Sequence, residues 1–185
     1  ENEPLTPVSV YALGKVTAYH ACKLYRDTFG LKIYGAIFYN HESEIRPEEY
    51  VTRKITKSVA RIFYGKQKIL KLGDVNTKID WGYAKDYVES SYKIMQLKKP
   101  DFFVIASGKK HSVLDFVKKS FKYVGLNYKQ YLKIDKKLFR PSKTASLVGN
   151  INKAKKTFKY RPKTNLDQLI SIMMENDLNN EKNNF

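Results

Sequence analysis

The pattern of hydrophobic and polar positions along the chain predicts alternating helices and strands. Helical spacing of apolar residues runs from Tyr11 to about Phe29, and Gly30 follows where a helix usually ends. Residues 31–40 form a short, mostly apolar run, which is typical of a buried strand. A polar loop and a helix that stops at Gly65 come next.

The same alternation continues through the second half of the chain. Residues 101–108 contain a continuous apolar run, which predicts a strand buried on both faces. Ser112 and Asp115 have the spacing of a helix N-cap and its capping box. The other predicted elements are strands near 68–73 and 131–135, helices over about 83–97, 152–160 and 166–178, and a disordered tail over 179–185. This order of elements predicts an α/β fold with parallel strand pairing.

Composition narrows the class of protein. The 185 residues are 42% hydrophobic, enough for a real core, and 35 basic against 18 acidic residues give a net charge of +17. The lysines are spread over almost every segment and no nucleic-acid-binding motif accompanies them, so we expect affinity for phosphates but no nucleic-acid partner. No apolar run is long enough for a membrane span and no signal-peptide pattern occurs, so we expect a cytoplasmic protein.

Cysteine and glycine usage exclude two kinds of site. Cys22 is the single cysteine, which rules out an internal disulfide and a thiol metal cluster; we expect it to be a small buried side chain, and we expect no metal site. No two of the nine glycines lie closer than five residues, so the chain contains no glycine-rich phosphate turn. We therefore expect any nucleotide-binding half to precede Glu1.

Tyr11 and Lys15 lie four residues apart at the head of the first predicted helix. Four residues bring the phenol and the ammonium to one helical face, where the positive charge favours phenolate and makes the tyrosine a usable base. The same spacing recurs at Tyr19/Lys23, Tyr50/Lys54 and Tyr64/Lys68, and roughly two such pairs are expected by chance. Only its position, on a helix leading into a buried strand, favours the first pair.

Further polar groups follow the predicted strands. Asn40 and His41 come directly after the second element, and Arg46 follows in the loop. Residues 52–54, Thr-Arg-Lys, open the next helix, where backbone N–H groups and cations together suit a phosphate. Each of these residues also fits an ordinary surface or core role.

Read in order, several segments resemble one family. They are TPVSVYALGK, FYNHES, VTRKIT, LGD, DWGYAKDYV, FVIASGKKHSV and FRPS, and they are similar to the GDP-mannose 4,6-dehydratases of the extended short-chain dehydrogenase/reductase superfamily. The resemblance implies the later part of a lyase that holds NADP. It implies that Tyr11 takes the proton from the mannose 4-hydroxyl and that Lys15 holds the nicotinamide ribose. The assisting Ser or Thr and the Glu base would lie upstream of Glu1.

The resemblance also assigns binding residues and partners. His41, Arg46 and Lys15 would contact NADP. The sugar-nucleotide side would be formed by Asn40, Thr52, Lys54, Leu72, Gly73, Lys78 and Arg140. The implied substrate is GDP-mannose, the implied product is GDP-4-keto-6-deoxymannose, and the implied assembly is a homodimer or homotetramer with the first helix at the dimer contact.

The resemblance implies the following division of the chain: 1–45, the end of an NADP-binding Rossmann-like domain; 46–80, a smaller α/β substrate-binding lobe; 81–111, a return to the Rossmann-like sheet; 112–178, a C-terminal substrate-binding lobe; and 179–185, the tail.

The chain departs from the family pattern at four positions. It has Glu44 and Ile45 where the family has Pro and Arg, Ile79 where it has Arg, and Lys143 where it has Glu. Lys78, next to Ile79, would replace the arginine only in part, because lysine cannot grip phosphate bidentately. Another nucleotide-sugar epimerase or dehydratase, or a degenerate structural subunit, therefore stays open, and we expect the chain alone to be inactive.

Overall fold

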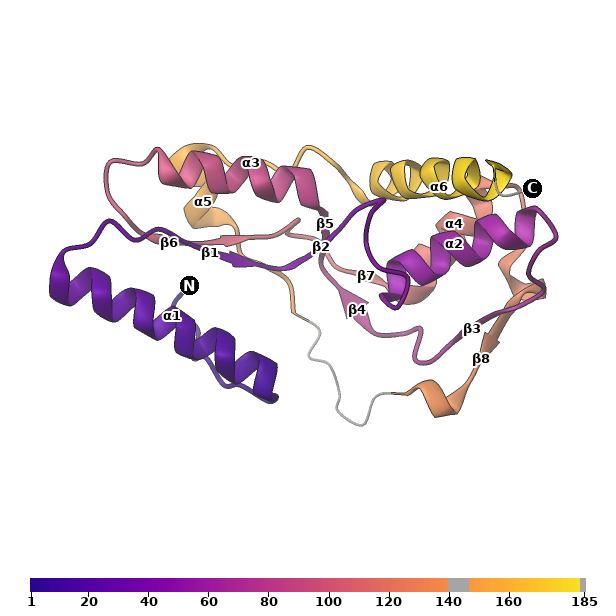
Figure 1. Cartoon of the computed structure of the whole chain (residues 1–185), viewed down its shortest axis with the longest axis horizontal. Coiled ribbons are helices and arrows are strands. Elements are labelled where there is room, and N and C mark those ends of the chain that lie inside the picture. The colour runs from indigo at the N-terminus through magenta and orange to yellow at the C-terminus, as the bar shows by residue number, and fades with distance from the viewer. Residues whose placement is uncertain (140–146, 184–185) are drawn as a thin grey trace.

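The structure, a computed structural model, describes residues 1–139 and 147–183 and has the predicted α/β class (Figure 1). Its helices lie at the predicted segments, and the two that follow Ser9 and Ser112 begin at side-chain N-caps. The helices are α1 (Val10–Phe29), α2 (Val51–Phe63), α3 (Ala84–Met95), α4 (Val113–Tyr123), α5 (Asn152–Phe158) and α6 (Leu166–Asn183), with 3-10 turns η1 (Tyr128–Gln130) and η2 (Lys136–Leu138).

The strands are short and form four pairs. Their bounds are β1 (Gly35–Phe38), β2 (Asn40–Glu42), β3 (Leu70–Leu72), β4 (Lys78–Ile79), β5 (Trp81–Tyr83), β6 (Phe102–Ile105), β7 (His111–Ser112) and β8 (Leu132–Ile134). The pairs β1–β6, β2–β5 and β3–β8 are parallel, as predicted. The pair β4–β7 is antiparallel, which the sequence pattern does not predict.

Helix α1 begins and ends at the predicted caps. The Ser9 hydroxyl accepts a hydrogen bond of 3.1 Å from the backbone N–H of Ala12, and Gly30 takes the left-handed conformation, with φ of 64°, that ends a helix. No residue of α1 is buried, and Cys22 is half-buried rather than buried, contrary to expectation. Within residues 1–139 and 147–183, neither α1 nor another helix is long and apolar enough to cross a membrane.

One hydrophobic core surrounds β1 and β6. All four residues of β6 are buried, which confirms the prediction of a strand covered on both faces. Helix α3 contributes Tyr87 and Ile94, and helix α5 contributes Ala154. We call this core the sheet cluster. Helix α5 belongs to it although the sequence analysis assigned 112–178 to one lobe, because apolar side chains of α5 face β6.

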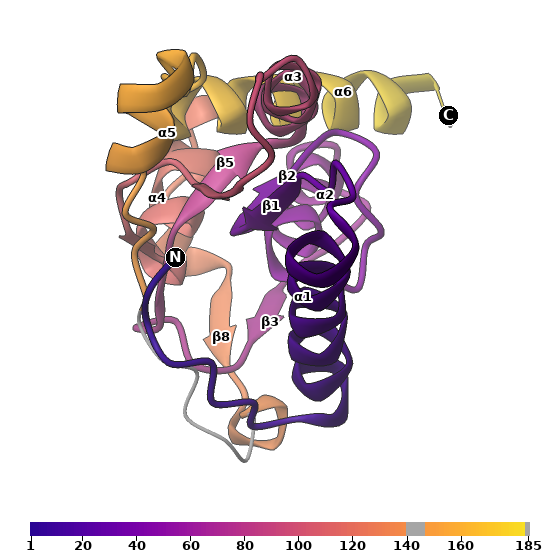
Figure 2. The ribbon, with the colours of Figure 1, turned by 90° about the vertical axis from the view of Figure 1, so that its left-hand side faces the viewer.

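A second hydrophobic core, the lobe cluster, lies among α2, α4, α6, β3 and β5. Its fully buried members include Ile55, Phe116 and the pair Met173 and Met174. Figure 2 shows β8 and β3 running side by side on the opposite side of this lobe from α6. Since α2, α4 and α6 supply three different stretches of chain, the lobe is closed only by contacts that are distant in sequence.

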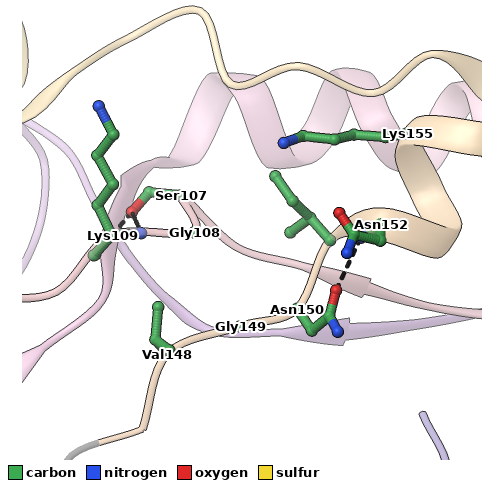
Figure 3. A pocket seen from close by; sticks show the side chains of 9 residues that line it. Ser107, Gly108, Lys109, Val148, Gly149, Asn150, Asn152 and Lys155 are labelled. Atoms are coloured by element: carbon green, nitrogen blue, oxygen red, sulfur yellow. Dashed lines mark hydrogen bonds between the residues drawn. The ribbon is translucent and has the colours of Figure 1, made fainter.

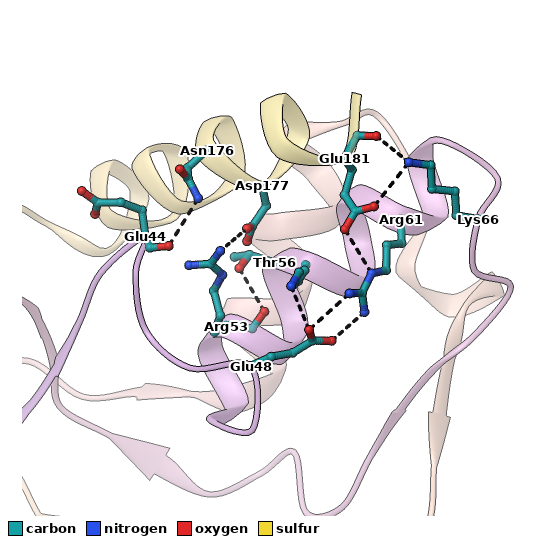
Figure 4. Close-up of polar contacts among 10 residues, drawn as sticks. Glu44, Glu48, Arg53, Thr56, Arg61, Lys66, Asn176, Asp177 and Glu181 are labelled. Atoms are coloured by element: carbon teal, nitrogen blue, oxygen red, sulfur yellow. Dashed lines mark hydrogen bonds and ion pairs between the residues drawn. The ribbon is translucent and has the colours of Figure 1, made fainter. Parts of the chain in front are cut away.

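The predicted disordered tail is wrong for residues 179–183, because α6 continues to Asn183. Glu181 is buried and accepts a hydrogen bond of 3.1 Å from Arg61 Nε, and Lys66 donates to its backbone oxygen (Figure 4). Arg61 in α2 and Lys66 after it thus hold the last turns of α6 in place, although this segment is polar.

Candidate functional site

Tyr11 and Lys15 lie together on an open face of α1. The Lys15 Nζ is 5.4 Å from the centre of the Tyr11 ring, and the Tyr11 side chain is 75% exposed. The end of α1 that carries this pair is the end nearer the lobe cluster in Figure 1. The pair therefore has the proximity and the access that a tyrosine base needs.

The other tyrosines with the same spacing have structural contacts. Tyr19 packs on Phe102 of β6 with ring centres 4.8 Å apart. Tyr50 lies under the guanidinium of Arg46, 3.6 Å away, and Tyr64 closes the end of α2. Among the four pairs, Tyr11 and Lys15 are thus the pair that combines an exposed phenol with a close ammonium.

Asn40 and His41 occupy β2, in register with Trp81 and Gly82 of β5. Asn40 is exposed, and the Nδ1 of His41 is 2.9 Å from the backbone oxygen of Tyr39. The His41 ring also contacts Tyr87, whose hydroxyl pKa is raised by burial. These contacts fix the imidazole, and they orient its Nε2 away from the Tyr39 carbonyl.

Arg46 lies between an acidic and an aromatic partner. Its Nε is 3.3 Å from Glu42 Oε2, an ion pair too bent for a hydrogen bond, and its Cζ lies 3.6 Å from the centre of the Tyr50 ring. Glu42 is 3% exposed and also accepts a hydrogen bond of 2.6 Å from the Thr52 hydroxyl. Burial raises the pKa of Glu42, and Thr52, Arg46 and His41 offset this only in part.

The first turn of α2 holds three of the predicted phosphate-binding residues, but they face different ways. Thr52 is fully buried, with its hydroxyl hydrogen directed to Glu42. Arg53 points into the lobe, where its Nη2 is 2.7 Å from Asp177 Oδ1 (Figure 4). Lys54 alone is partly exposed, so it is the side chain of this turn that can reach a phosphate.

Leu72 and Gly73 lie at the end of β3. Leu72 is buried and its backbone oxygen accepts a hydrogen bond of 2.8 Å from the backbone N–H of Asp135. A Cβ on Gly73 would lie 2.5 Å from the backbone oxygen of Leu138, so a glycine is required for this close approach. Lys78 is exposed on β4, and Ile79 beside it packs against the lobe cluster.

The structure brings the predicted residues together in three groups. Asn40, His41, Arg46, Thr52 and Lys54 share the β2–α2 connection. Tyr11 and Lys15 lie on α1, while Leu72, Gly73 and Lys78 lie along β3 and β4; among the described residues no hydrogen bond or ion pair joins the three groups. Arg140 and Lys143 lie outside the described residues.

A cavity of about 430 Å³ lies between two segments of the chain, the one that follows β6 and the one that leads into α5 (Figure 3). Lys109 and Lys155 give its wall positive charge, and Asn150 and Asn152 supply polar groups. The sequence analysis did not identify this cavity, because its two walls are about forty residues apart in the chain.

The sequence analysis quoted two buried carboxylates, Asp80 and Glu42, within its motifs and assigned no role to either. Asp80 is 1% exposed and accepts backbone hydrogen bonds from Ser107, Gly108 and Gly149. Glu42 was quoted only as part of a motif. For Asp80 the available signal was its place between Ile79 and Trp81, because an acidic side chain in an apolar stretch is stable there only when it is hydrogen-bonded.

Comparison with known proteins identifies the family. The sequence profile described as GDP-mannose 4,6 dehydratase matches residues 1–173. The chain is 42% identical to GDP-mannose 4,6 dehydratase 1 of Arabidopsis thaliana, over 96% of this chain and 49% of that protein. It is 40% identical to the GDP-mannose 4,6 dehydratase of Dictyostelium discoideum, over 99% and 56%. The chain thus spans about half the length of these curated relatives.

Solved structures agree with the fold. RMD from Pseudomonas aeruginosa, complexed with NADPH, superposes with a TM-score of 0.89 at 16% identity, covering 97% of this chain and 60% of that one. The dTDP-glucose 4,6-dehydratase of Bacillus anthracis, in complex with NAD, gives 0.84 at 20% identity, covering 98% and 56%. At these identities the likeness establishes the fold alone. The profile and the curated relatives go further: this chain belongs to the GDP-mannose 4,6-dehydratase family.

Proposed function

We propose that the chain forms the part of a GDP-mannose 4,6-dehydratase that carries the tyrosine base and most of the sugar-nucleotide site. The observation that carries this proposal is the exposed Tyr11 with the Lys15 ammonium 5.4 Å from its ring, in a chain of this family. The reaction removes water from GDP-mannose and leaves GDP-4-keto-6-deoxymannose. The cytoplasm is the compartment that we infer for it.

Tyr11 acts as the base for the 4-hydroxyl of mannose. As the base, Tyr11 accepts the hydroxyl proton on its phenolate oxygen as C4 is oxidised, with the Lys15 ammonium 5.4 Å from the centre of its ring. Two bonds of the sugar break in this step: the proton of the O–H bond passes to Tyr11, the hydride of the C4–H bond would pass to the bound cofactor, and a C=O forms at C4. Open access to Tyr11 supports this assignment, because the sugar must reach the phenol directly.

The residues present fit a phosphate-bearing cofactor such as NADP. The Arg46 guanidinium is already held in place by Glu42 and Tyr50, and Lys15 lies on the same exposed helix as the base. NADP, when bound, takes up a hydride from the sugar and later returns one. Arg46 and His41 would hold the cofactor, and Lys15 its ribose, while Lys54 and Lys78 would attract the diphosphate of the substrate.

We also infer that α1 is covered in the active protein, and that a homo-oligomer forms there. The helix has no buried residue and exposes large apolar side chains, among them Leu13 at 54% and Leu24 at 60%. Exposed apolar area of this kind marks an interface in soluble proteins.

Incubation of the full-length protein with GDP-mannose and NADP tests the proposal. The expected product is the 4-keto-6-deoxy sugar nucleotide, detected by mass spectrometry as a loss of water. A product of unchanged mass that separates from GDP-mannose by chromatography would be an epimer and would favour another nucleotide-sugar enzyme, whereas unchanged substrate would favour a structural subunit.

A further inference from the structure

Glu42 joins two parts of the site through a single carboxylate oxygen. Its Oε2 accepts the Thr52 hydroxyl hydrogen at 2.6 Å and lies 3.3 Å from the Nε of Arg46. Thr52 belongs to the first turn of α2, whereas Arg46 belongs to the loop between β2 and α2. The carboxylate itself is anchored in β2, so three consecutive elements meet at one oxygen atom.

Because Thr52 and Arg46 share one carboxylate oxygen, the stability of each contact depends on the other. A carboxylate that is 3% exposed is costly unless it is hydrogen-bonded and paired. Thr52 supplies the hydrogen bond and Arg46 supplies the countercharge. If either partner moves away, the buried carboxylate is undercompensated and no longer stable in its position, so the acceptor that holds the other partner in place is lost with it.

A second contact reinforces the link. The Arg46 guanidinium stacks on Tyr50, and Tyr50 is the residue from which α2 begins. The backbone oxygen of Tyr50 accepts a hydrogen bond of 2.8 Å from the N–H of Lys54. Arg46 is therefore connected to the first turn of α2 in two ways: its Nε through Glu42 to Thr52, and the plane of its guanidinium through Tyr50. The position of Lys54 depends on both contacts.

We propose that Glu42 is a positioning residue that couples the cofactor side of the site to the sugar-nucleotide side. The proposal rests on the proposed function, in which Arg46 contacts NADP and the first turn of α2 contacts the sugar nucleotide. A ligand phosphate that holds Arg46 stabilises the Glu42 pair, and through Thr52 it fixes the turn that carries Lys54. Binding of one ligand then strengthens binding of the other, with no contact between Glu42 and either ligand.

The test measures this coupling directly in the full-length protein. NADPH affinity is determined by fluorescence titration with and without saturating GDP, in the wild type and in Glu42→Gln, which keeps the shape and removes the charge. We expect GDP to tighten NADPH binding at least about fivefold in the wild type, and less than about twofold in Glu42→Gln. If Glu42 had only a structural role, Glu42→Gln would lower thermal stability. The ratio of NADPH affinities with and without GDP would then be the same as in the wild type.

A neighbouring glutamate provides the matched control. Glu44 lies two residues away, and its carboxylate contacts only the Tyr83 hydroxyl, at 3.4 Å, among the described residues. Glu44→Gln should preserve the wild-type ratio. Thr52→Val removes the hydrogen bond to Glu42 and keeps the ion pair with Arg46. If Glu42→Gln does not fold, Thr52→Val is measured in its place. We expect it to lower the effect of GDP on NADPH affinity as well.

The outcomes separate the two proposals. If the wild type binds neither NADPH nor GDP, the proposed function fails, and the coupling fails with it. If the wild type binds both ligands and the ratio is the same in Glu42→Gln, or is close to one in the wild type, then the proposed function stands and the role of Glu42 is refuted.

Discussion

The Oδ2 of Asp80 accepts a hydrogen bond of 3.1 Å from the backbone N–H of Gly149, 69 residues further along the chain. The same oxygen accepts from Gly108 N at 3.0 Å, while Oδ1 accepts from Ser107 N at 2.9 Å. Asp80 lies between β4 and β5, next to Trp81 of the lobe cluster, whereas Ser107 follows Ala106 of the sheet cluster. One carboxylate therefore fixes three passages of the chain between the two halves of the molecule.

Asp80→Asn should destabilise the protein strongly. Its amide NH2 would replace an oxygen that two backbone N–H groups share, so buried donors would lose their acceptor. We expect the free energy of unfolding to fall by about 3 kcal/mol, measured by urea denaturation followed by circular dichroism. Asp74→Asn, in an exposed turn with contacts to Asn76 and Thr77, should cost less than about 1 kcal/mol. Equal effects of the two changes would contradict this role of Asp80.

Tyr11→Phe should abolish most of the dehydratase activity of the full-length protein. The change removes one oxygen from an exposed side chain, so stability should not change, while loss of the proton acceptor should lower kcat at least about 100-fold. Tyr19→Phe on the same helix has the same spacing to a lysine and keeps its ring contact with Phe102. Retained activity in Tyr11→Phe, or a similar loss in Tyr19→Phe, would refute the assignment.

Gly73→Ala should lower the stability of the protein, and Gly14→Ala should raise it. A Cβ on Gly73 would meet the Leu138 backbone oxygen at 2.5 Å, so the end of β3 must shift, at a cost of about 1–3 kcal/mol. Gly14 lies within α1 with nothing within 4 Å of the added Cβ, and alanine there should add about 0.5–1 kcal/mol. Thermal unfolding of both variants measures this. Stabilisation by Gly73→Ala would show that the close approach to Leu138 is not required.

The capping box of α4 should make stability depend on pH. The Ser112 hydroxyl and backbone N–H bonds hold the pKa of Asp115 below its ordinary value of 3.8. A lowered pKa means that the ionised form stabilises the fold at pH values above 3.8, and that this contribution is lost as the pH falls through the folded-state pKa.

Asp115→Asn should therefore cost up to about 1 kcal/mol at pH 7 and less at about pH 2.5, where the carboxylate is more protonated. Urea denaturation at the two pH values measures the difference between the variant and the wild type. A cost that is independent of pH would mean that the ionised carboxylate does not stabilise the cap.

Local sequence signals were sufficient where the structural cause is local. Ser112 and Asp115 are three residues apart, and the capping box that they predict is present. The helical end of α6 was missed because Glu181 is stabilised by Arg61 and Lys66, more than a hundred residues away. Spacing alone likewise did not separate Tyr11 from the other tyrosines, since the difference lies in what each ring contacts.

The candidate site shows the same limit. The family motifs located residues 40–54, but the inward direction of Arg53 depends on Asp177 of α6. Burial raises the pKa of Asp177, and Thr56 and Arg53 offset this only in part. A pairing between α2 and α6 is not visible in either segment alone.

The interleaving of the two cores has a consequence for how the protein is made. The lobe cluster draws on residues 51–83, 113–132 and 166–178, and the sheet cluster on 34–39, 87–106 and 151–160. During synthesis the lobe cannot close its core until Met173 and Met174 have left the ribosome, about 110 residues after the end of α2. For the same reason no contiguous piece can be transplanted to exchange one lobe between relatives; such a graft must carry at least three separate segments.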